Sequence, residues 1–216
     1  MEVLIVAKTH MKNAFCIGAY DITNKRNVRL LTSSENNQPL DTRFGIGQIW
    51  EIDYIKRQNI IKPHIEDVLI QNATFLRNID NIYDFLINNV NIWKGNPDEI
   101  FYGKINFPIG KSGFLEQKNN ELSQSVGFWM PDNDIELTIL QDQKHYLYFG
   151  QQVYSFPYVG TFNKVETIKK GAILRVSLTR WWSPNINKIP KRCYCQLSGW
   201  FNKTDNLNEA IDDLPF

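Results

Sequence analysis

A ten-residue segment near the end of the chain alternates aromatic, cationic and small polar side chains with apolar ones. The segment is RCYCQLSGWF, residues 192–201. In a β-strand successive side chains point to opposite faces, so Arg192, Tyr194 and Trp200 share one face and the cysteines lie on the other. Aromatic rings stack on bases and cations contact phosphates. We therefore predict that Arg192, Tyr194 and Trp200 contact a nucleic acid.

A second alternating segment, residues 170–180, continues into another basic and aromatic sequence, Arg-Trp-Trp. Arg175 shares one face with Ile173, Ser177 and Thr179, opposite Ala172, Leu174, Val176 and Leu178, and a cation-rich loop follows the two tryptophans. We predict that Arg175, Arg180, Trp181 and Lys191 belong to the same nucleic-acid-binding surface. The alternative interpretation is structural, because tryptophan is usually buried and paired tryptophans can close the end of a barrel.

Four cations in the first 43 residues are further candidates for nucleic-acid contact. If the amino-terminal strands form an OB-fold, its first loop and its second and third strands belong to the usual oligonucleotide-binding face. On this basis we predict nucleic-acid contacts for Lys8, Lys12, Arg29 and Arg43. Isolated solvated charges give the same pattern, so the signal is weak.

Metal binding and catalysis have less support. Cys193 and Cys195 could supply two thiolates, with Cys16 and one histidine (His10, His64 or His145) completing four ligands. A structural zinc site usually shows two paired ligand clusters, and the second pair is missing. No nucleophile motif or phosphate-binding glycine loop is present. We expect no metal, no cofactor and no catalytic residue.

The chain closes with Asp212, Asp213, Leu214, Pro215 and Phe216. A terminal phenylalanine can fill an apolar pocket, its carboxylate can pair with a cation, and proline favours an extended approach. Acidic residues upstream steer the segment toward a basic surface. The alternative is a frayed terminus whose acidity only aids solubility. We predict that these five residues bind a partner protein.

The elements that must position these residues are mainly β-strands. Short apolar or alternating segments separated by turn-forming residues predict the following strands: 2–8, 14–20, 26–31, 47–56, 64–70, 112–116, 126–130, 134–140, 144–149, 151–158, 170–180 and 192–201. Five strands within about 70 residues suit a small Greek-key barrel. The later strands predict a second barrel, although the last ones could return to the first.

Residues 78–90 instead repeat apolar side chains at helical spacing, which predicts one helix. We therefore expect two OB-like Greek-key barrels, one connecting helix and a flexible acidic tail. The expected parts are a first barrel, a linking helix and turn, a second barrel and a docking tail. Their bounds are 1–76, 77–97, 98–203 and 204–216.

Composition and charge agree with a cytoplasmic protein. The 216 residues are 43% hydrophobic and include only three cysteines, which suggests no disulfide framework. No apolar segment is long enough for a membrane-spanning helix, and the amino terminus does not resemble a secretory signal. Four of the 23 acidic residues follow the last basic one, Lys203, so the first 203 residues carry a formal charge of about +5. That charge is modest for a nucleic-acid binder.

The last five residues resemble the acidic tip of bacterial single-stranded DNA-binding proteins, which recruits repair and replication proteins. The resemblance implies that the five residues from Asp212 to Phe216 dock the same kind of partner. The rest of the chain does not resemble the single OB core of those proteins.

The body resembles the bacterial dual-OB-containing domain family. The residues that carry this resemblance lie at 14–31, 47–57, 62–70, 174–184 and 192–201. The resemblance implies two OB-like barrels and says little about activity, because a fold does not give a function.

Three hypotheses follow. In the first, the protein binds nucleic acid without catalysis, prefers single-stranded DNA and docks partners through its tip, in genome maintenance or phage conflict. In the second, it is an adaptor that uses the tip without contacting DNA. In the third, the region of Trp181 and Trp182 is the pocket of a small-ligand binder or an enzyme.

Overall fold

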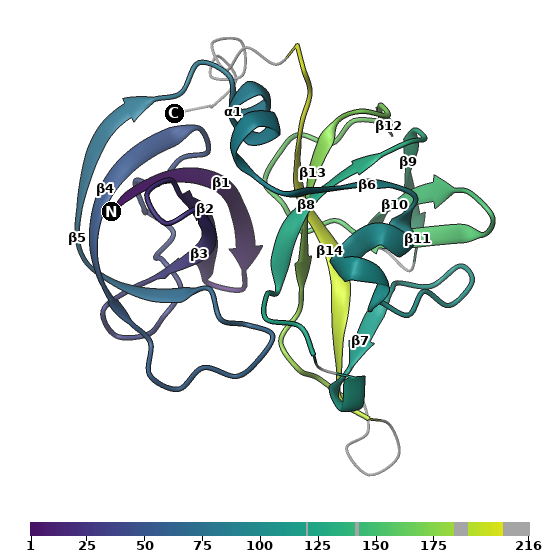
Figure 1. Cartoon of the computed structure of the whole chain (residues 1–216), viewed down its shortest axis with the longest axis horizontal. Helices are drawn as coiled ribbons and strands as arrows, with labels where there is room; N and C mark the ends of the chain where they lie inside the picture. The colour runs from purple at the N-terminus through teal and green to yellow at the C-terminus, as the bar shows by residue number, and fades with distance from the viewer. Residues whose placement is uncertain (120, 141–142, 184–189, 205–216) are drawn as a thin grey trace. The chain divides into compact units, whose positions relative to one another are not determined.

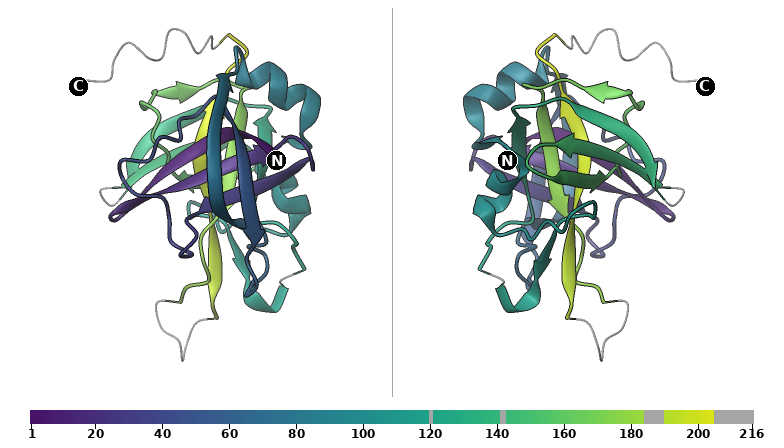
Figure 2. Two further views of the ribbon diagram at one scale, coloured as in Figure 1. Left: turned by 90° about the vertical axis from the view of Figure 1, so that its left-hand side faces the viewer. Right: turned by 90° about the vertical axis from the view of Figure 1, so that its right-hand side faces the viewer.

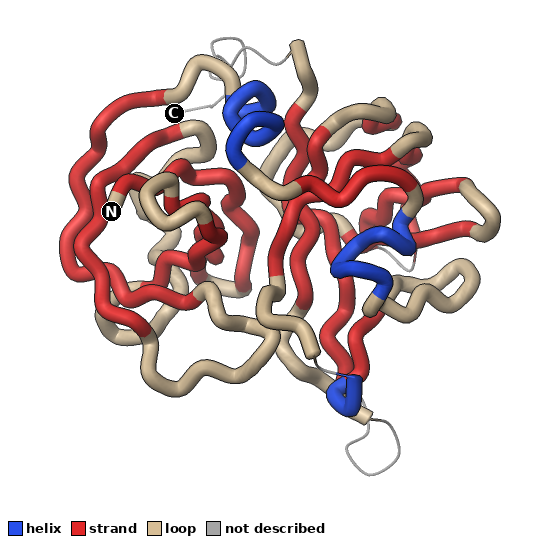
Figure 3. Tube along the Cα trace, viewed as in Figure 1, coloured by secondary structure: helices blue, strands red, loops and turns tan. Residues whose placement is uncertain are grey.

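The computed structural model describes residues 1–119, 121–140, 143–183 and 190–204, and these residues are mainly β-strands (Figure 1 and Figure 3). The strands are β1 (Glu2–Met11), β2 (Ala14–Asp21), β3 (Arg26–Leu31), β4 (Gln48–Lys56), β5 (Asp67–Asn78), β6 (Ile92–Gly95), β7 (Phe114–Glu116), β8 (Val126–Pro131), β9 (Ile135–Leu140), β10 (Gln143–Phe149), β11 (Val153–Pro157), β12 (Thr167–Ile168), β13 (Ile173–Leu178) and β14 (Arg192–Phe201). No helix in these ranges is long and apolar enough to cross a membrane.

The chain divides into two compact units. Among the described residues, unit 1 comprises Met1–Asn59, Glu66–Val90 and the chain from Phe201 to Thr204, and unit 2 comprises Ile60–Ile65 and Asn91–Trp200. The short segment Ile60–Ile65, which connects β4 with β5, therefore groups with unit 2 although both of its flanking strands belong to unit 1.

Unit 1 is a closed five-stranded barrel with the strand order β1-β2-β3-β5-β4 (Figure 1). β1 pairs with both β2 and β4, which closes the sheet, and β3 pairs with β5 in parallel. This order is the Greek-key arrangement of an OB-fold. Alternate residues of the strands fill the interior, as Val3 and Ile5 of β1 do together with Trp50 and Ile52 of β4. Period-two alternation in the sequence therefore produces the barrel core.

Unit 2 contains a four-stranded sheet, β11-β10-β9-β12, and a five-stranded sheet, β6-β8-β13-β14-β7 (Figure 2). The two sheets share one aromatic-rich core, in which Trp129 lies 5.4 Å from Phe156 between ring centroids. The last strand, β14, lies between β13 and β7, so it belongs to the sheet of unit 2. The expectation of a mainly β fold with two OB-like barrels is confirmed.

The predicted helix is present but shorter than expected. α1 spans Ile82–Asn89, because β5 continues to Asn78 and Asn81 caps the helix by accepting a hydrogen bond from the backbone N–H of Asp84 at 3.1 Å. After this helix the chain forms β6, and Pro97–Gly103 then forms short 3₁₀ turns that are interrupted by a kink at Ile100, Phe101 and Tyr102. The short strands β6 and β12 were not predicted, because two to four residues give too little periodicity to detect.

Candidate nucleic-acid interface

The first half of β14 presents a cation and an aromatic ring on its partly exposed face. The guanidinium carbon of Arg192 lies 3.9 Å from the ring centroid of Phe114 on the neighbouring strand β7. The ring of Tyr194 lies 6.1 Å from the same phenylalanine. The pairing of Arg192 with Glu116 and of Tyr194 with Phe114 in the β7–β14 register positions these side chains.

Trp182 extends this face. Its backbone exchanges two hydrogen bonds with Arg192, of 3.0 and 2.8 Å, and its ring lies 6.2 Å from that of Tyr194. The side chain is 55% exposed, which is unusual for a tryptophan. We call Trp182, Lys191, Arg192 and Tyr194 the aromatic-cation patch. It combines a free ring face with cations, the combination that binds single-stranded nucleic acid.

The two neighbouring tryptophans differ in environment. The indole N–H of Trp181 donates to the carbonyl of Lys62 at 2.8 Å, and the ring packs against the core of unit 2. The predicted binding residue Trp181 is therefore half-buried, whereas Trp182 is open to solvent. Arg180 beside them is also exposed.

The charges of the patch are only partly compensated. Arg192 Nη2 lies 3.2 Å from Glu116 Oε1, and Lys118 lies 3.2 Å from the other carboxylate oxygen. The hydrogen bonds from Lys118 and Arg192 lower the pKa of Glu116, so this carboxylate remains ionised at neutral pH. The exposed amine of Lys191 makes no ion pair with any described residue. The patch thus keeps at least one uncompensated positive charge.

Two predicted binding residues are buried. Every residue of β13 is buried, and Arg175, 4% exposed, donates from Nη1 to Ser198 Oγ at 3.0 Å. Trp200 is 5% exposed and packs against Tyr146 and Tyr158 with centroid distances of 5.6 and 5.3 Å. Both faces of β13, and of β14 beyond Gln196, are covered, so alternation does not distinguish an inner from an outer face there. Neither side chain is accessible to a ligand in this structure.

The amino-terminal candidates do not form one cluster. Lys8 is half-buried and lies over the ring of Phe15 at 4.4 Å, and desolvation lowers the pKa of its amine. Lys12 is exposed in the turn between β1 and β2. Arg43 is exposed after β3, with its guanidinium carbon 5.5 Å from the ring centroid of Trp50.

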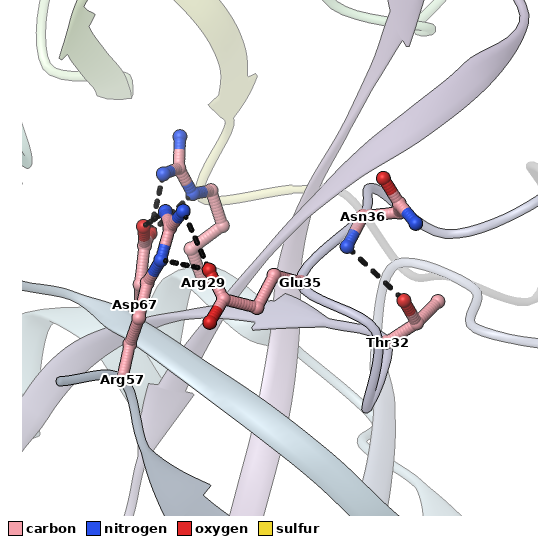
Figure 4. A network of polar contacts seen from close by, with 6 residues as sticks. All are labelled: Arg29, Thr32, Glu35, Asn36, Arg57 and Asp67. Atoms are coloured by element: carbon pink, nitrogen blue, oxygen red, sulfur yellow. Dashed lines mark hydrogen bonds and ion pairs between the residues drawn. The ribbon is translucent and has the colours of Figure 1, made fainter. Parts of the chain in front are cut away.

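Arg29 belongs to a network of ion pairs (Figure 4). Its Nε donates to Asp67 Oδ1 at 2.6 Å, and Arg57 Nη1 contacts the other oxygen of this carboxylate at 2.8 Å. Arg57 Nη2 also lies 2.9 Å from Glu35 Oε2. Asp67 is almost fully buried, so two arginines share one desolvated carboxylate. This network was not predicted from the sequence, because its members lie up to 38 residues apart.

Replacement of Asp67 by asparagine is expected to lower the free energy of unfolding by about 2 kcal/mol, because it leaves two guanidinium groups without their shared counter-charge. Denaturant titrations of the wild type and the variant measure this difference. Asp53→Asn is a matched control, since Asp53 lies exposed on β4 of the same unit. Equal stability of the two variants would contradict the structural role of the network.

The cysteines of β14 face the interior of unit 2. Cys193 and Cys195 are fully buried, and Cys193 Sγ lies 3.7 Å from His64 Nε2. Desolvation raises the pKa of each thiol to about 12, so both stay protonated at neutral pH. No group of three or more potential metal ligands occurs within the described ranges.

The structure thus brings together Arg192 and Tyr194 of the predicted set, with the exposed Lys191 directly before them in the chain, and it adds Trp182, whose exposure a sequence does not reveal. The predicted partner-binding residues Asp212, Asp213, Leu214, Pro215 and Phe216 lie outside the described residues.

Comparison with known families gave one match: the family model described as "Dual OB-containing domain" matches residues 1–200. A search of curated proteins found no match.

Proposed function

Because the chain belongs to the dual OB-containing domain family, we propose that it is a non-enzymatic nucleic-acid-binding protein that prefers single-stranded DNA. The exposure of Trp182 beside Tyr194 and Arg192 of β14 is the observation that carries this proposal. Base–aromatic stacking needs an accessible ring, and only an unpaired strand offers the faces of its bases.

The position of the patch within unit 2 adds support. Two backbone hydrogen bonds join Trp182 to Arg192, so the backbone positions the indole ring and the guanidinium next to each other. Arg192 is further held by Phe114 and Glu116. A ligand therefore meets a guanidinium that is already held in place, which reduces the entropic cost of binding.

We also propose that the tip, from Asp212 to Phe216, docks repair or replication proteins, in genome maintenance or in phage conflict. Its support is the resemblance to the tip of single-stranded DNA-binding proteins. The three free cysteines agree with a cytoplasmic setting. The adaptor hypothesis remains a second candidate, since the formal net charge of the whole chain is only +1.

Fluorescence anisotropy with a labelled single-stranded DNA tests the proposal. We expect saturable binding that weakens as salt rises, because bound phosphates release counterions. A duplex of the same sequence should bind less tightly, since its bases are stacked and paired. An oligonucleotide that shows no salt-sensitive binding would refute DNA contact and leave the adaptor hypothesis.

A further inference from the structure

Unit 1 contains a cavity of about 360 Å³ that is distinct from the patch of unit 2. Its wall consists of residues from the segment 32–44, which follows β3, together with Trp50 of β4 and two residues of β5. The volume falls at the lower end of the range for small-molecule sites, so the cavity suits one small ligand.

Arg43 supplies a positive charge to this cavity. It is exposed, its guanidinium lies over the ring of Trp50, and it makes no ion pair or hydrogen bond with any described residue. Arg29 and Arg57 of the same unit, by contrast, form ion pairs with Asp67. A stacked guanidinium without a carboxylate partner is well suited to bind an anion with two parallel hydrogen bonds.

The remaining polar groups of the cavity complement a ligand that carries hydrogen-bond donors in addition to its negative charge. Ser33 and Thr42 provide hydroxyls and Asp41 provides a carboxylate, and their side chains make no hydrogen bond among the described residues. A phosphate alone would be repelled by Asp41. A carboxylate beside an arginine fits a ligand that has hydroxyl or amino donors as well as a phosphate, as a nucleotide does.

An apolar surface completes the wall. Phe44 and Trp50 contact each other edge to face at 4.9 Å, and Ile70 and Ala73 lie on the adjacent strand β5. Phe44 and Trp50 are almost fully buried, so Ile70 and Ala73 supply the accessible part of this wall, against which a planar ring can lie while a few polar groups fix its orientation.

The cavity is held open by its surroundings. The turn at its rim is closed by hydrogen bonds between Thr32 and Asn36, including one of 3.1 Å from the Asn36 N–H to the Thr32 hydroxyl (Figure 4). Glu35 of this turn is tied to Arg57. Gln38, almost fully buried, donates to the carbonyl of Leu30 at 3.1 Å. Because these residues are already ordered, binding of a ligand requires little free energy for rearrangement of the site.

We infer that this cavity binds one nucleoside monophosphate, with the phosphate on Arg43, sugar or base donors on Asp41, and the base against the apolar wall at Ile70 and Ala73. The same chemistry comes from a free nucleotide or from the 5′-phosphorylated end of a single strand. The inference is independent of the aromatic-cation patch, because it rests on unit 1 alone.

Isothermal titration calorimetry of the full chain with AMP, GMP, CMP and UMP tests this inference. At least one nucleotide should bind, and Arg43→Gln should weaken it about tenfold through loss of a charge-assisted contact. Lys56→Gln, which removes an exposed cation of unit 1 outside the cavity, should leave the affinity unchanged. Oligonucleotides with and without a 5′-phosphate distinguish a strand end from a free nucleotide.

Three results would overturn the inference: no heat of binding at millimolar nucleotide, equal affinities of Arg43→Gln and Lys56→Gln, or equally tight binding of inorganic phosphate, which indicates a plain anion site. A double substitution of Trp182 and Lys191 should not change nucleotide affinity. The experiments therefore distinguish a cavity that does not bind nucleotides from an aromatic-cation patch that does not bind DNA.

Discussion

A double variant, Trp182→Ala with Lys191→Ala, is expected to bind a single-stranded oligonucleotide about a hundredfold more weakly than the wild type. Loss of one base–aromatic stack costs about 1–3 kcal/mol, and loss of one phosphate contact adds to it. Both side chains are exposed, so their removal should leave the free energy of unfolding nearly unchanged.

Anisotropy titrations at several salt concentrations separate the two contributions. Removal of Lys191 should make the salt dependence shallower by about 0.7 in logarithmic slope, as expected for one phosphate contact on a single strand. Trp182→Phe keeps an aromatic ring and serves as the matched control for stacking. If Trp182→Ala binds as tightly as Trp182→Phe, the patch is not where bases stack.

Deletion of the five residues from Asp212 to Phe216 is expected to abolish capture of partner proteins. The phenylalanine side chain would be lost together with Asp212 and Asp213, and these are the groups that an apolar pocket with a basic rim would hold. Pull-downs from a bacterial lysate with the full and the shortened chain measure the effect.

The free pentapeptide DDLPF should compete for the same partners. A chain that ends in the same five residues in reversed order retains the net charge and length, so it controls for non-specific acidity. If the shortened chain captures the same proteins as the full chain, the tip has no docking role. DNA binding by the shortened chain should remain, which would show that the two activities are separate.

The sequence predicted most strands and the barrel architecture because alternation and turn residues are local signals. It also placed the cysteines of β14 on the face opposite Arg192 and Tyr194, and the structure shows Cys193 and Cys195 buried in the core. The prediction for Arg175 and Trp200 assumed that β13 and β14 each expose one face to solvent along their whole length. Their faces are covered, and a sequence does not show which strand lies in the middle of a sheet.

The sequence predicted the residues of the candidate sites less well than it predicted the fold. Arg29 looked like a free cation, but Asp67 neutralises it across 38 residues of chain. Trp182 looked identical to Trp181, yet only one of them donates its indole N–H to Lys62 and packs inward. Such distinctions depend on long-range contacts, which residue types and spacing do not encode.

The grouping of Ile60–Ile65 with unit 2 has a consequence for anyone who wishes to express the units as separate fragments. A single cut after Val90 yields a carboxyl-terminal fragment that lacks the carbonyl of Lys62, to which Trp181 donates, and the imidazole of His64 beside Cys193. The units are therefore interleaved along the chain. A faithful fragment of unit 2 would need that short segment restored, for example by fusion to its amino terminus.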